Sequence, residues 1–373
     1  METTTAQENS NVKLTNFSLN IISRVFKMAF VSFCTLVCLI ACVVAWGRGD
    51  FGKVGPLKMA LYSKKLIQCN HDRKLDLNVT EMDVHLYDFP RNDVEKFTID
   101  EAADGILSFP TLDKTKKFLI FVGGFKSEIN KRTEGIVRDA FRNHPNSYII
   151  MLDHSAYTHD REGQIKSYER SVTYVHYIGK ALANLLIKLH QGGISAKNMH
   201  CIGHSLGGQI LGSTGEIFLK NTGVKIARIT ALDPAGPCFQ NSFIHNQVRS
   251  GLADYVEVYH CNSGGFGSSS ILGDVDFFIN KNGERQPNCG ISWVPEIYDS
   301  SKAAKCSHNV CIKIWTATIK NADWYPATRC DNYKNFKNGE CKNNEKAIAG
   351  FWNPGNATGV YYVSTEGYDY ETS

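Results

Sequence analysis

The stretch Asn198–Gly208, NMHCIGHSLGG, decides how the rest of this chain is interpreted. An apolar run leads into a GxSxG pentapeptide and a helical pattern follows it, which predicts a strand, a sharp turn and a helix. Such a turn holds Ser205 in a strained backbone conformation, in which side chains at Gly203 and Gly207 would collide. The Ser205 hydroxyl then stands clear of the sheet. The backbone N–H of Leu206 points to where negative charge would develop on an attacked carbonyl group.

Two further segments supply the partners that a nucleophilic serine needs. The strand-like run Ile226–Leu232 ends in an acid at a turn, Asp233, and the tripeptide CSH brings a histidine, His308. Ester hydrolysis needs a nucleophile, a base and a carboxylate that orients the base, and the order Ser, Asp, His is that of α/β-hydrolases. We therefore assign Ser205 as nucleophile, His308 as base and Asp233 as its partner; the plainer alternatives are a helix-capping serine, a surface histidine and a turn aspartate. His204 is rejected as the base, because an immediate neighbour on this turn points away from the serine hydroxyl.

Six motifs follow one another along the chain: GHSLG (203–207), LDPAGP (232–237), ADYVEVYH (253–260), GDVDFF (273–278), QPNC (286–289) and CSH (306–308). In this order they resemble the pancreatic lipase family, which includes triacylglycerol lipases and phospholipases A1. The likeness runs from about Leu86 to Thr365. It implies an α/β-hydrolase fold, in which a central, mostly parallel sheet carries helices on both faces.

Hydrophobic periodicity predicts the same α/β fold class. The segments with strand patterns are 84–89, 117–122 and 147–153. Residues 165–190 have helical spacing, and strands that alternate with helices give a parallel sheet with right-handed crossovers. We expect a single domain over residues 47–373. Only 65 residues follow His308, so we expect no lipid-binding β-sandwich of the kind that many of these lipases carry after the catalytic domain.

The apolar run 117–122 ends at Gly123-Gly124-Phe125, a turn with a chemical role in the family that this chain resembles. There, a His-Gly-Phe-like turn provides the second oxyanion donor, which is the backbone N–H of the aromatic residue. Phe125 matches that residue, whereas Gly123 replaces the histidine. We expect Phe125 and Leu206 to donate to the oxyanion, with a turn loosened by the missing histidine. The alternative is a plain pair of glycines between a strand and a loop.

Two loops resemble those that select the substrate in this family. Cys289 and Cys306 enclose 16 residues with the apolar members of a lid, Trp293 among them, which would contact a lipid surface; the alternative is ordinary loop packing. The loop Cys261–Leu272 is rich in Gly and Ser. Both loops are short, as in phospholipases A1, so we expect hydrolysis of the sn-1 ester of a phospholipid. The alternatives are a triacylglycerol or galactolipid lipase and, from another class, a catalytically silent storage or lipid-binding protein of the same fold.

The cysteines indicate an oxidising compartment. Three of the twelve lie in an apolar N-terminal segment, and Cys201, in the strand before the turn, is expected to be a free, buried thiol. The resemblance implies the disulfides Cys289–Cys306 and Cys330–Cys341. Four cysteines remain, for which the sequence does not rank the three possible pairings: Cys69, Cys238, Cys261 and Cys311.

The N-terminal residues concern targeting. Residues 1–27 are polar and expected to be disordered. Residues 28–46 contain a run of 18 uncharged, mostly apolar residues, which fits a cleaved signal peptide or an uncleaved signal anchor; a buried core helix is the third possibility. The first two place the catalytic part outside the cytosol, as a secreted protein or, alternatively, in the endomembrane lumen or on a single-pass type II membrane protein. The triplets that begin at Asn78 and Asn356 are N-glycosylation acceptors.

Charge and ligand spacing exclude several other classes of function. The net charge of +4 is scattered along the chain, which gives no reason to expect a nucleic-acid partner. The histidines and acids show no metal-ligand spacing such as HExxH, so we expect neither a metal nor a cofactor. Where some relatives hold calcium, Gly251 and Leu252 replace the acidic pair. Asp274 and Asp276 are expected to form turn and strand hydrogen bonds. Nothing in the sequence predicts an oligomeric state.

Overall fold

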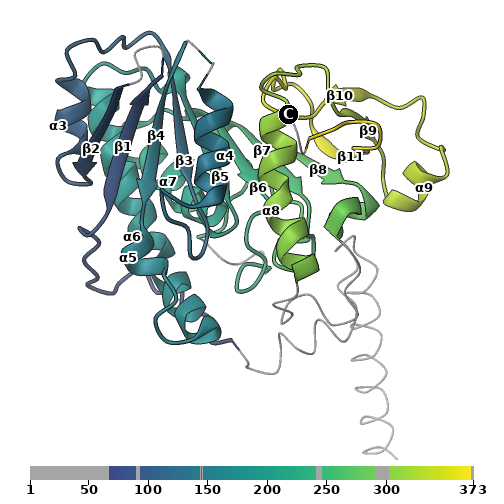
Figure 1. Ribbon diagram of the computed structural model, residues 1–373, viewed down its shortest axis with the longest axis horizontal. Helices are drawn as coiled ribbons and strands as arrows, with labels where there is room; N and C mark the ends of the chain where they lie inside the picture. The colour runs from purple at the N-terminus through teal and green to yellow at the C-terminus, as the bar shows by residue number, and fades with distance from the viewer. Residues whose placement is uncertain are drawn as a thin grey trace, which may run out of the picture. The chain divides into compact units, whose positions relative to one another are not determined.

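One mostly parallel sheet of eleven strands runs through the part of the chain that the computed structural model describes, which is residues 67–89, 93–142, 144, 146–240, 246–289 and 302–370 (Figure 1). The strand order is β10-β9-β11-β8-β7-β6-β5-β3-β4-β1-β2. The strands are β1 (Asp83–Asp88), β2 (Asp93–Thr98), β3 (Lys117–Val122), β4 (Ser147–Asp153), β5 (Met199–His204), β6 (Ile226–Leu232), β7 (Ala253–His260), β8 (Val275–Ile279), β9 (Pro326–Arg329), β10 (Lys346–Ile348) and β11 (Gly359–Val363).

Helices cover both faces of the sheet, as predicted (Figure 1). The helices are α3 (Ala102–Leu107), α4 (Arg132–Phe141), α5 (Ser155–Thr158), α6 (Gln164–Gln191), α7 (Leu206–Thr222), α8 (Lys302–Ala317) and α9 (Tyr333–Lys337). Buried side chains of α3, α6 and α7 form one core with one face of the sheet, and those of α4 and α8 form a second core with the other face. This arrangement is the α/β-hydrolase fold.

The central strands are the apolar runs that the sequence singled out. In β3, five of the six residues are buried, and β4 is buried over its first six residues. Both strands pair in parallel, as expected of strands with helices on either side. The edge of this mostly parallel sheet is antiparallel: β1 runs antiparallel to β4 and to β2. The short connection from β1 to β2 allows only an antiparallel pair, because a parallel pair needs a crossover of a dozen or more residues.

Helix α7 carries the central turn and packs closely on α6. A Cβ atom on Gly179 of α6 would lie 2.7 Å from the Ile210 carbonyl oxygen of α7, so only glycine permits this approach. The helix ends at Gly223, which has a φ of 73° and donates its N–H to the Leu219 carbonyl. The helical pattern in the sequence, Gln209–Leu219, predicts a later start than Leu206, and helix ends determined in different ways commonly differ by one or two residues.

Residues 67–80 contain no helix or strand, and side-chain contacts attach them to α6 and α7. The disulfide Cys69–Cys238 fixes their start. Arg73 forms an ion pair of 2.9 Å with Glu216 of α7, and the Tyr177 hydroxyl of α6 donates to the Asp72 carbonyl. This segment therefore belongs to the folded domain although its sequence has little hydrophobic pattern.

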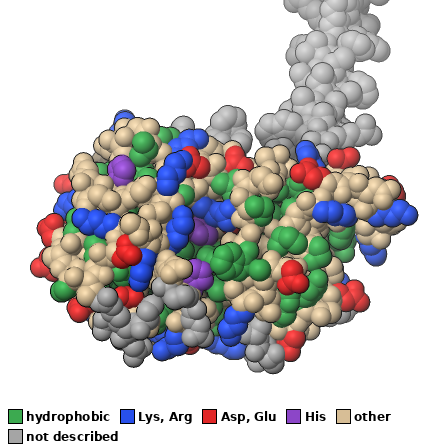
Figure 2. Space-filling model, turned by 90° about the horizontal axis from the view of Figure 1, so that it is seen from above, with side chains coloured by type: hydrophobic (Ala, Val, Ile, Leu, Met, Phe, Trp, Pro, Cys, Tyr) green, Lys and Arg blue, Asp and Glu red, His purple; other side chains and the backbone are tan. Residues whose placement is uncertain are grey.

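The predicted N-terminal tail (1–27) and signal segment (28–46) lie outside the described residues. Within the described ranges, no helix has the length and apolar character needed to cross a bilayer. On the face shown in Figure 2, Lys and Arg side chains are interspersed with Asp and Glu, in line with the scattered charge of the sequence.

Candidate active site

The turn between β5 and α7 has the geometry that the GxSxG motif predicts. Ser205 adopts φ 55° and ψ −120°, a strained conformation for a residue with a side chain. A Cβ on Gly203 would lie 2.6 Å from the Gly207 carbonyl carbon, and one on Gly207 would lie 2.7 Å from the Val122 carbonyl carbon. Both glycines are therefore required by backbone atoms that pass within contact distance.

Asp233 and His308, 75 residues apart in sequence, form a hydrogen bond at the same end of the sheet. The distance between Asp233 Oδ2 and His308 Nδ1 is 2.5 Å. The other carboxylate oxygen accepts the backbone N–H groups of Cys261 at 2.7 Å and Asn262 at 2.9 Å. Asp233 is fully buried, so these three bonds fix both its carboxylate and the ring that it holds.

Ser205 lies beside this pair through the backbone of β6. Its N–H donates to the carbonyl of Leu232, the residue before Asp233, at 3.0 Å. The hydrogen bonds found among the described residues do not include one from the Ser205 hydroxyl to His308. Such a bond often forms only when substrate is bound. The fold thus brings the three predicted residues to one place, and their catalytic roles remain proposals.

His204, which the sequence analysis rejected as the base, has a different partner. Its Nε2 lies 3.1 Å from the carbonyl oxygen of His308, and the two rings pack with centroids 4.6 Å apart. Burial, and secondly the charge on His308, lower the pKa of His204 to about 3. A neutral His204 that contacts the backbone of α8 holds that helix in place and is not available to Ser205.

Two disulfides fix α8 close to His308. Cys306 pairs with Cys289, as the resemblance implies, and Cys311 pairs with Cys261 at the end of β7. The structure therefore selects one of the three open pairings, Cys261–Cys311 together with Cys69–Cys238. The implied disulfide Cys330–Cys341 is also present.

Cys201 is a free and fully buried thiol in β5, as predicted. Burial raises its pKa to about 12. A thiol with so little thiolate character is a packing residue of the core.

The loop Cys261–Leu272 reaches across Asp233, which the sequence analysis did not foresee. A Cβ on Gly267 would lie 2.6 Å from Asp233 Oδ2, so glycine is needed for the loop to cover the carboxylate. The N–H of Ser268 donates to the Pro234 carbonyl at 2.7 Å and closes the loop over this place. Gly267 stands in a run of Gly and Ser, and that composition gave no signal that one of the glycines would be essential.

The expected hydrogen bonds of Asp274 and Asp276 are present at the end of this loop. Asp274 accepts the N–H of Val256 at 2.8 Å. Asp276 accepts the N–H of Gly273 at 3.0 Å and a bond of 2.8 Å from His260 Nε2. Both carboxylates thus fix the start of β8.

The turn after β3 directly contacts the nucleophile elbow, which is the turn between β5 and α7 that carries Ser205. A Cβ on Gly124 would lie 2.8 Å from Ser205 Cβ, so the turn and the serine are in van der Waals contact. The Phe125 ring packs edge-on against Tyr168 of α6, with centroids 5.4 Å apart. Leu206 is the first residue of α7, where backbone N–H groups have no partner within the helix. These positions suit the predicted roles of Phe125 and Leu206.

Several contacts hold this turn where the family histidine is replaced by Gly123. The N–H of Ser127 donates to the Gly124 carbonyl and the N–H of Lys126 to the Thr158 carbonyl, both at 3.1 Å. The place of a side chain at Gly123 is filled by Glu134, whose Oε1 would lie 2.6 Å from a Cβ there. Contacts from other segments hold the turn where the family histidine is missing.

The structure describes the cysteines that bound the expected lid and both expected glycosylation sites. The disulfide Cys289–Cys306 that would delimit the lid is formed, whereas Trp293 lies outside the described residues. Asn78 and Asn356 are both exposed, which a glycosylation acceptor requires, and their modification stays a prediction.

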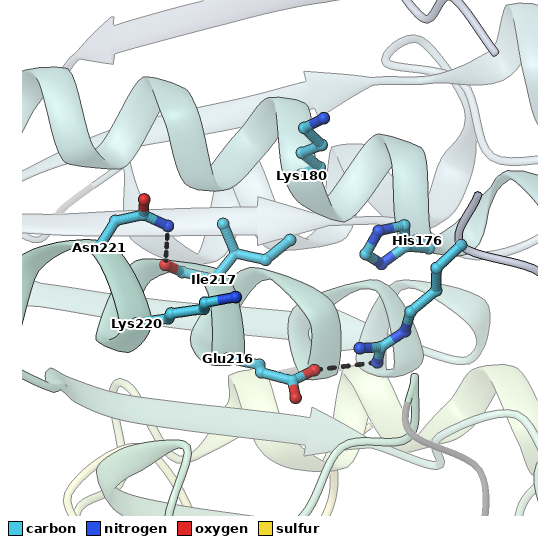
Figure 3. Close-up of a pocket in the computed structure, with 7 residues that line it drawn as sticks. His176, Lys180, Glu216, Ile217, Lys220 and Asn221 are labelled. Carbon is cyan, nitrogen blue, oxygen red and sulfur yellow. Dashed lines mark hydrogen bonds and ion pairs between the residues drawn. The ribbon is translucent and has the colours of Figure 1, made fainter. Parts of the chain in front are cut away.

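A separate hollow of about 310 Å³ lies between α6 and α7, away from the elbow (Figure 3). His176 and Lys180 line it from α6, and Glu216 and Lys220 from α7. It shares no residue with the Ser205 site. Within the described ranges, no cluster of three or more His, Cys, Asp or Glu residues could hold a metal ion.

Comparison with known proteins identifies the family. The profile described as Lipase matches residues 58–352. The chain belongs to the lipase family. Among its curated relatives in the lipase family, it is 34% identical to Lipase member H of Rattus norvegicus over 149 residues, 40% of this chain and 31% of the relative. It is 32% identical to Phospholipase A1 member A of Bos taurus over 179 residues, 48% of this chain and 37% of the relative.

A third lipase relative, Probable phospholipase A1 magnifin of Vespa magnifica, is 31% identical over 229 residues, 60% of this chain and 65% of the relative. The matched stretch thus spans about a third of the two mammalian relatives and about two thirds of the wasp protein.

Proposed function

We propose that this lipase-family chain hydrolyses carboxylic esters of lipids through an acyl-enzyme on Ser205. The observation that carries the proposal is the 2.5 Å bond between Asp233 and His308 Nδ1, beside the strained serine. Because Nδ1 faces the carboxylate, His308 keeps Nε2 to accept the proton of the Ser205 hydroxyl. Attack on the ester carbonyl then forms the acyl-enzyme, and the leaving alcohol takes that proton. Water, activated by the same His308, releases the fatty acid and restores Ser205.

The backbone N–H groups of Leu206 and Phe125 are the donors that we assign to the oxyanion. The N–H of Leu206 lies at the N-terminus of α7, where the helix dipole also favours negative charge. The turn that carries Phe125 touches Ser205 through Gly124. A pair of such donors stabilises the tetrahedral intermediate more than the substrate, which is the condition for catalysis.

As substrate we propose a phospholipid, from which the sn-1 acyl chain is released. Two of the relatives are named phospholipase A1, and the loops Cys261–Leu272 and 290–305 are both short, which suits an open site that admits a polar head group. A triacylglycerol or galactolipid is the second candidate substrate. The buried Asp233–His308 pair argues against a silent lipid-binding protein, because such a protein has no use for it.

We also propose that the catalytic domain acts outside the cytosol, as a secreted protein. Within the described residues, four disulfides join eight cysteines, which is typical of an oxidising compartment. The exposed acceptors Asn78 and Asn356 suit the same assignment. Treatment of the protein from insect-cell medium with an endoglycosidase should lower its mass by removing glycans from Asn78 and Asn356. An unmodified chain retained in the cytosol would contradict the proposal.

The full chain and its Ser205→Ala variant, each incubated with phosphatidylcholine vesicles and with trioleoylglycerol emulsion, test the activity. We expect a serine-dependent 2-acyl lysophospholipid, identified by mass spectrometry. Fatty acid released from trioleoylglycerol alone would assign the chain to the neutral lipases. Equal product from both forms of the chain would leave the silent lipid-binding protein as the better explanation.

Substitution of Trp293 tests the proposed contact between the lid and a lipid surface. We expect Trp293→Ala to slow hydrolysis of aggregated lipid more than hydrolysis of a soluble short-chain ester, because only the aggregate offers an apolar surface for an indole ring. Trp352→Ala is the matched control, since Trp352 is 48% exposed and lies far from Cys289 in the sequence. Equal losses of Trp293→Ala on both substrates would remove the interfacial role.

A further inference from the structure

The carbonyl of Gly123, where the turn after β3 begins, is bonded by a histidine of another segment. His154 follows β4, and its Nε2 lies 3.0 Å from the Gly123 oxygen. The side chain is only 1% exposed. Four residues later, the Thr158 carbonyl accepts the N–H of Lys126 from the far end of the same turn. The short segment with α5, beside the lower end of α6 in Figure 1, therefore holds the turn at two places.

The hydrogen bonds of His154 determine which of its nitrogens carries the proton. A carbonyl oxygen can only accept, so Nε2 must donate to Gly123. The second nitrogen, Nδ1, lies 2.8 Å from Thr158 Oγ1, whose one proton can go to Nδ1 or to the His154 carbonyl oxygen at 3.2 Å; in the neutral ring Nδ1 is the acceptor. Burial lowers the pKa of His154, which keeps the ring neutral and this tautomer in place. The ring is therefore a fixed donor toward Gly123.

The position of the Gly123 carbonyl sets that of the oxyanion donor. Two consecutive glycines leave the backbone free to rotate, because neither has a Cβ to restrict it. The carbonyl passes the elbow so closely that a Cβ on Gly207 would lie 2.5 Å from its oxygen. Gly124 touches Ser205, and the N–H of Phe125 is the next donor along the chain. A rotation at Gly123 would displace that N–H relative to the Ser205 hydroxyl.

No side chain at position 123 itself can hold the turn. Ser127 Oγ bonds Glu134 Oε1, and both atoms occupy the space where a Cβ of Gly123 would lie. Glu134 is buried at 3% exposure, so this space is permanently filled. The hydrogen bond to the carbonyl comes instead from His154.

We propose that His154 is a positioning residue for catalysis, which holds the Gly123 carbonyl through Nε2–H and thereby orients the Phe125 N–H toward the oxyanion. This inference rests on the proposed ester hydrolysis at Ser205. His154 does not touch the reacting atoms. Its effect is on the rate of the chemical step, because an oxyanion donor acts on the transition state and little on the bound substrate.

Paired substitutions of His154 in the full chain test the proposal. His154→Met fills the same space without a donor, and His154→Gln offers an amide N–H in place of Nε2. On a soluble short-chain ester we expect His154→Met to lower kcat about 100-fold with KM changed less than about threefold. We expect His154→Gln to retain kcat within about fivefold, because the donor remains. His200→Met is the matched control, as it removes a buried histidine that bonds Thr230 on another part of the sheet.

Several outcomes would overturn the proposal. Unchanged kcat in His154→Met, or equal losses in His154→Met and His154→Gln, would reduce the ring to packing. A loss in His200→Met as large as in His154→Met would show a general effect of buried polar groups. If His154→Met does not fold, His154→Leu decides instead, since it also fills the site without a donor to the Gly123 carbonyl; unchanged kcat there overturns the proposal. A parent chain without Ser205-dependent hydrolysis would overturn the proposed function, and this inference with it.

Discussion

Gly124→Ala is the substitution that best tests whether the turn after β3 and the elbow form one unit. A Cβ built on Gly124 would lie 2.8 Å from Ser205 Cβ and 3.2 Å from both Ser205 Oγ and the His204 carbonyl oxygen. Carbon atoms in contact are normally about 3.5–4.0 Å apart. The turn and the serine must therefore separate by about 0.7–1.2 Å.

A separation of this size changes the distance between the nucleophile and the oxyanion donor on the turn. A misplacement of about 1 Å costs on the order of 100-fold in rate, which corresponds to about 2.7 kcal/mol in activation free energy. We expect kcat of Gly124→Ala on a soluble short-chain ester to fall by that factor. The labelling of Ser205 by a fluorophosphonate, followed to completion, counts the folded sites and so separates slow chemistry from loss of protein.

Gly135→Ala is the matched control for Gly124→Ala. Gly135 lies in α4, and its nearest neighbour would be Arg138 Nη2 at 3.5 Å from the new Cβ, an ordinary contact. We expect full activity and a gain in stability of about 0.5–1 kcal/mol, since alanine is the better helix former. A Gly124→Ala variant with the kcat of the parent chain would refute the reasoning, because the turn could then not be in contact with Ser205 during catalysis.

Three further predictions concern the site and its supports. Asp233→Asn should lower kcat by about 10³–10⁴, because an amide cannot accept from two backbone N–H groups and also from His308 Nδ1; steady-state kinetics measure it, and a loss below tenfold would contradict the assigned role. Burial raises the pKa of Glu134 from 4.5 to about 7. Between these pH values the carboxyl group is protonated in the folded chain and ionised in the unfolded chain. The free energy of unfolding therefore falls by up to about 3 kcal/mol as the pH rises from 4.5 to 7. Glu134→Gln should remove this loss. A change in unfolding free energy between pH 5 and pH 8 that is equal in the parent chain and the variant would contradict the prediction. Replacing Cys69 and Cys238 by alanine should cost about 2–5 kcal/mol in urea unfolding, because their disulfide joins residues 169 apart; a cost below 1 kcal/mol would show that residues 67–80 do not need it.

Local sequence patterns were sufficient for the elbow and the central strands. A GxSxG motif is recognised from only five residues. The strands β3 and β4 are buried on both faces of the sheet, and this burial is the reason that their sequences are continuous apolar runs. The order of Ser205, Asp233 and His308 selected one aspartate and one histidine among many. The structure then joined these two residues by a hydrogen bond.

The pairing of the cysteines and the supports of the turn were decided by tertiary structure. Cys261 and Cys311 are 50 residues apart, and no local pattern indicates that β7 ends beside α8. The histidine that the family resemblance expected at Gly123 is absent, and the sequence alone therefore predicted a loose turn. His154 reaches the Gly123 carbonyl from a segment 31 residues away.

What the sequence by itself determined is thus the fold class, the family and the residues of the candidate site, because each follows from motifs a few residues long. What only the tertiary structure decided is how these residues are held: by Gly267 over Asp233, by the disulfides on either side of His308, and by His154 under the turn. Each of these supports joins segments far apart in the chain. Their proximity depends on the packing of the whole sheet and its helices, which no local stretch of sequence records.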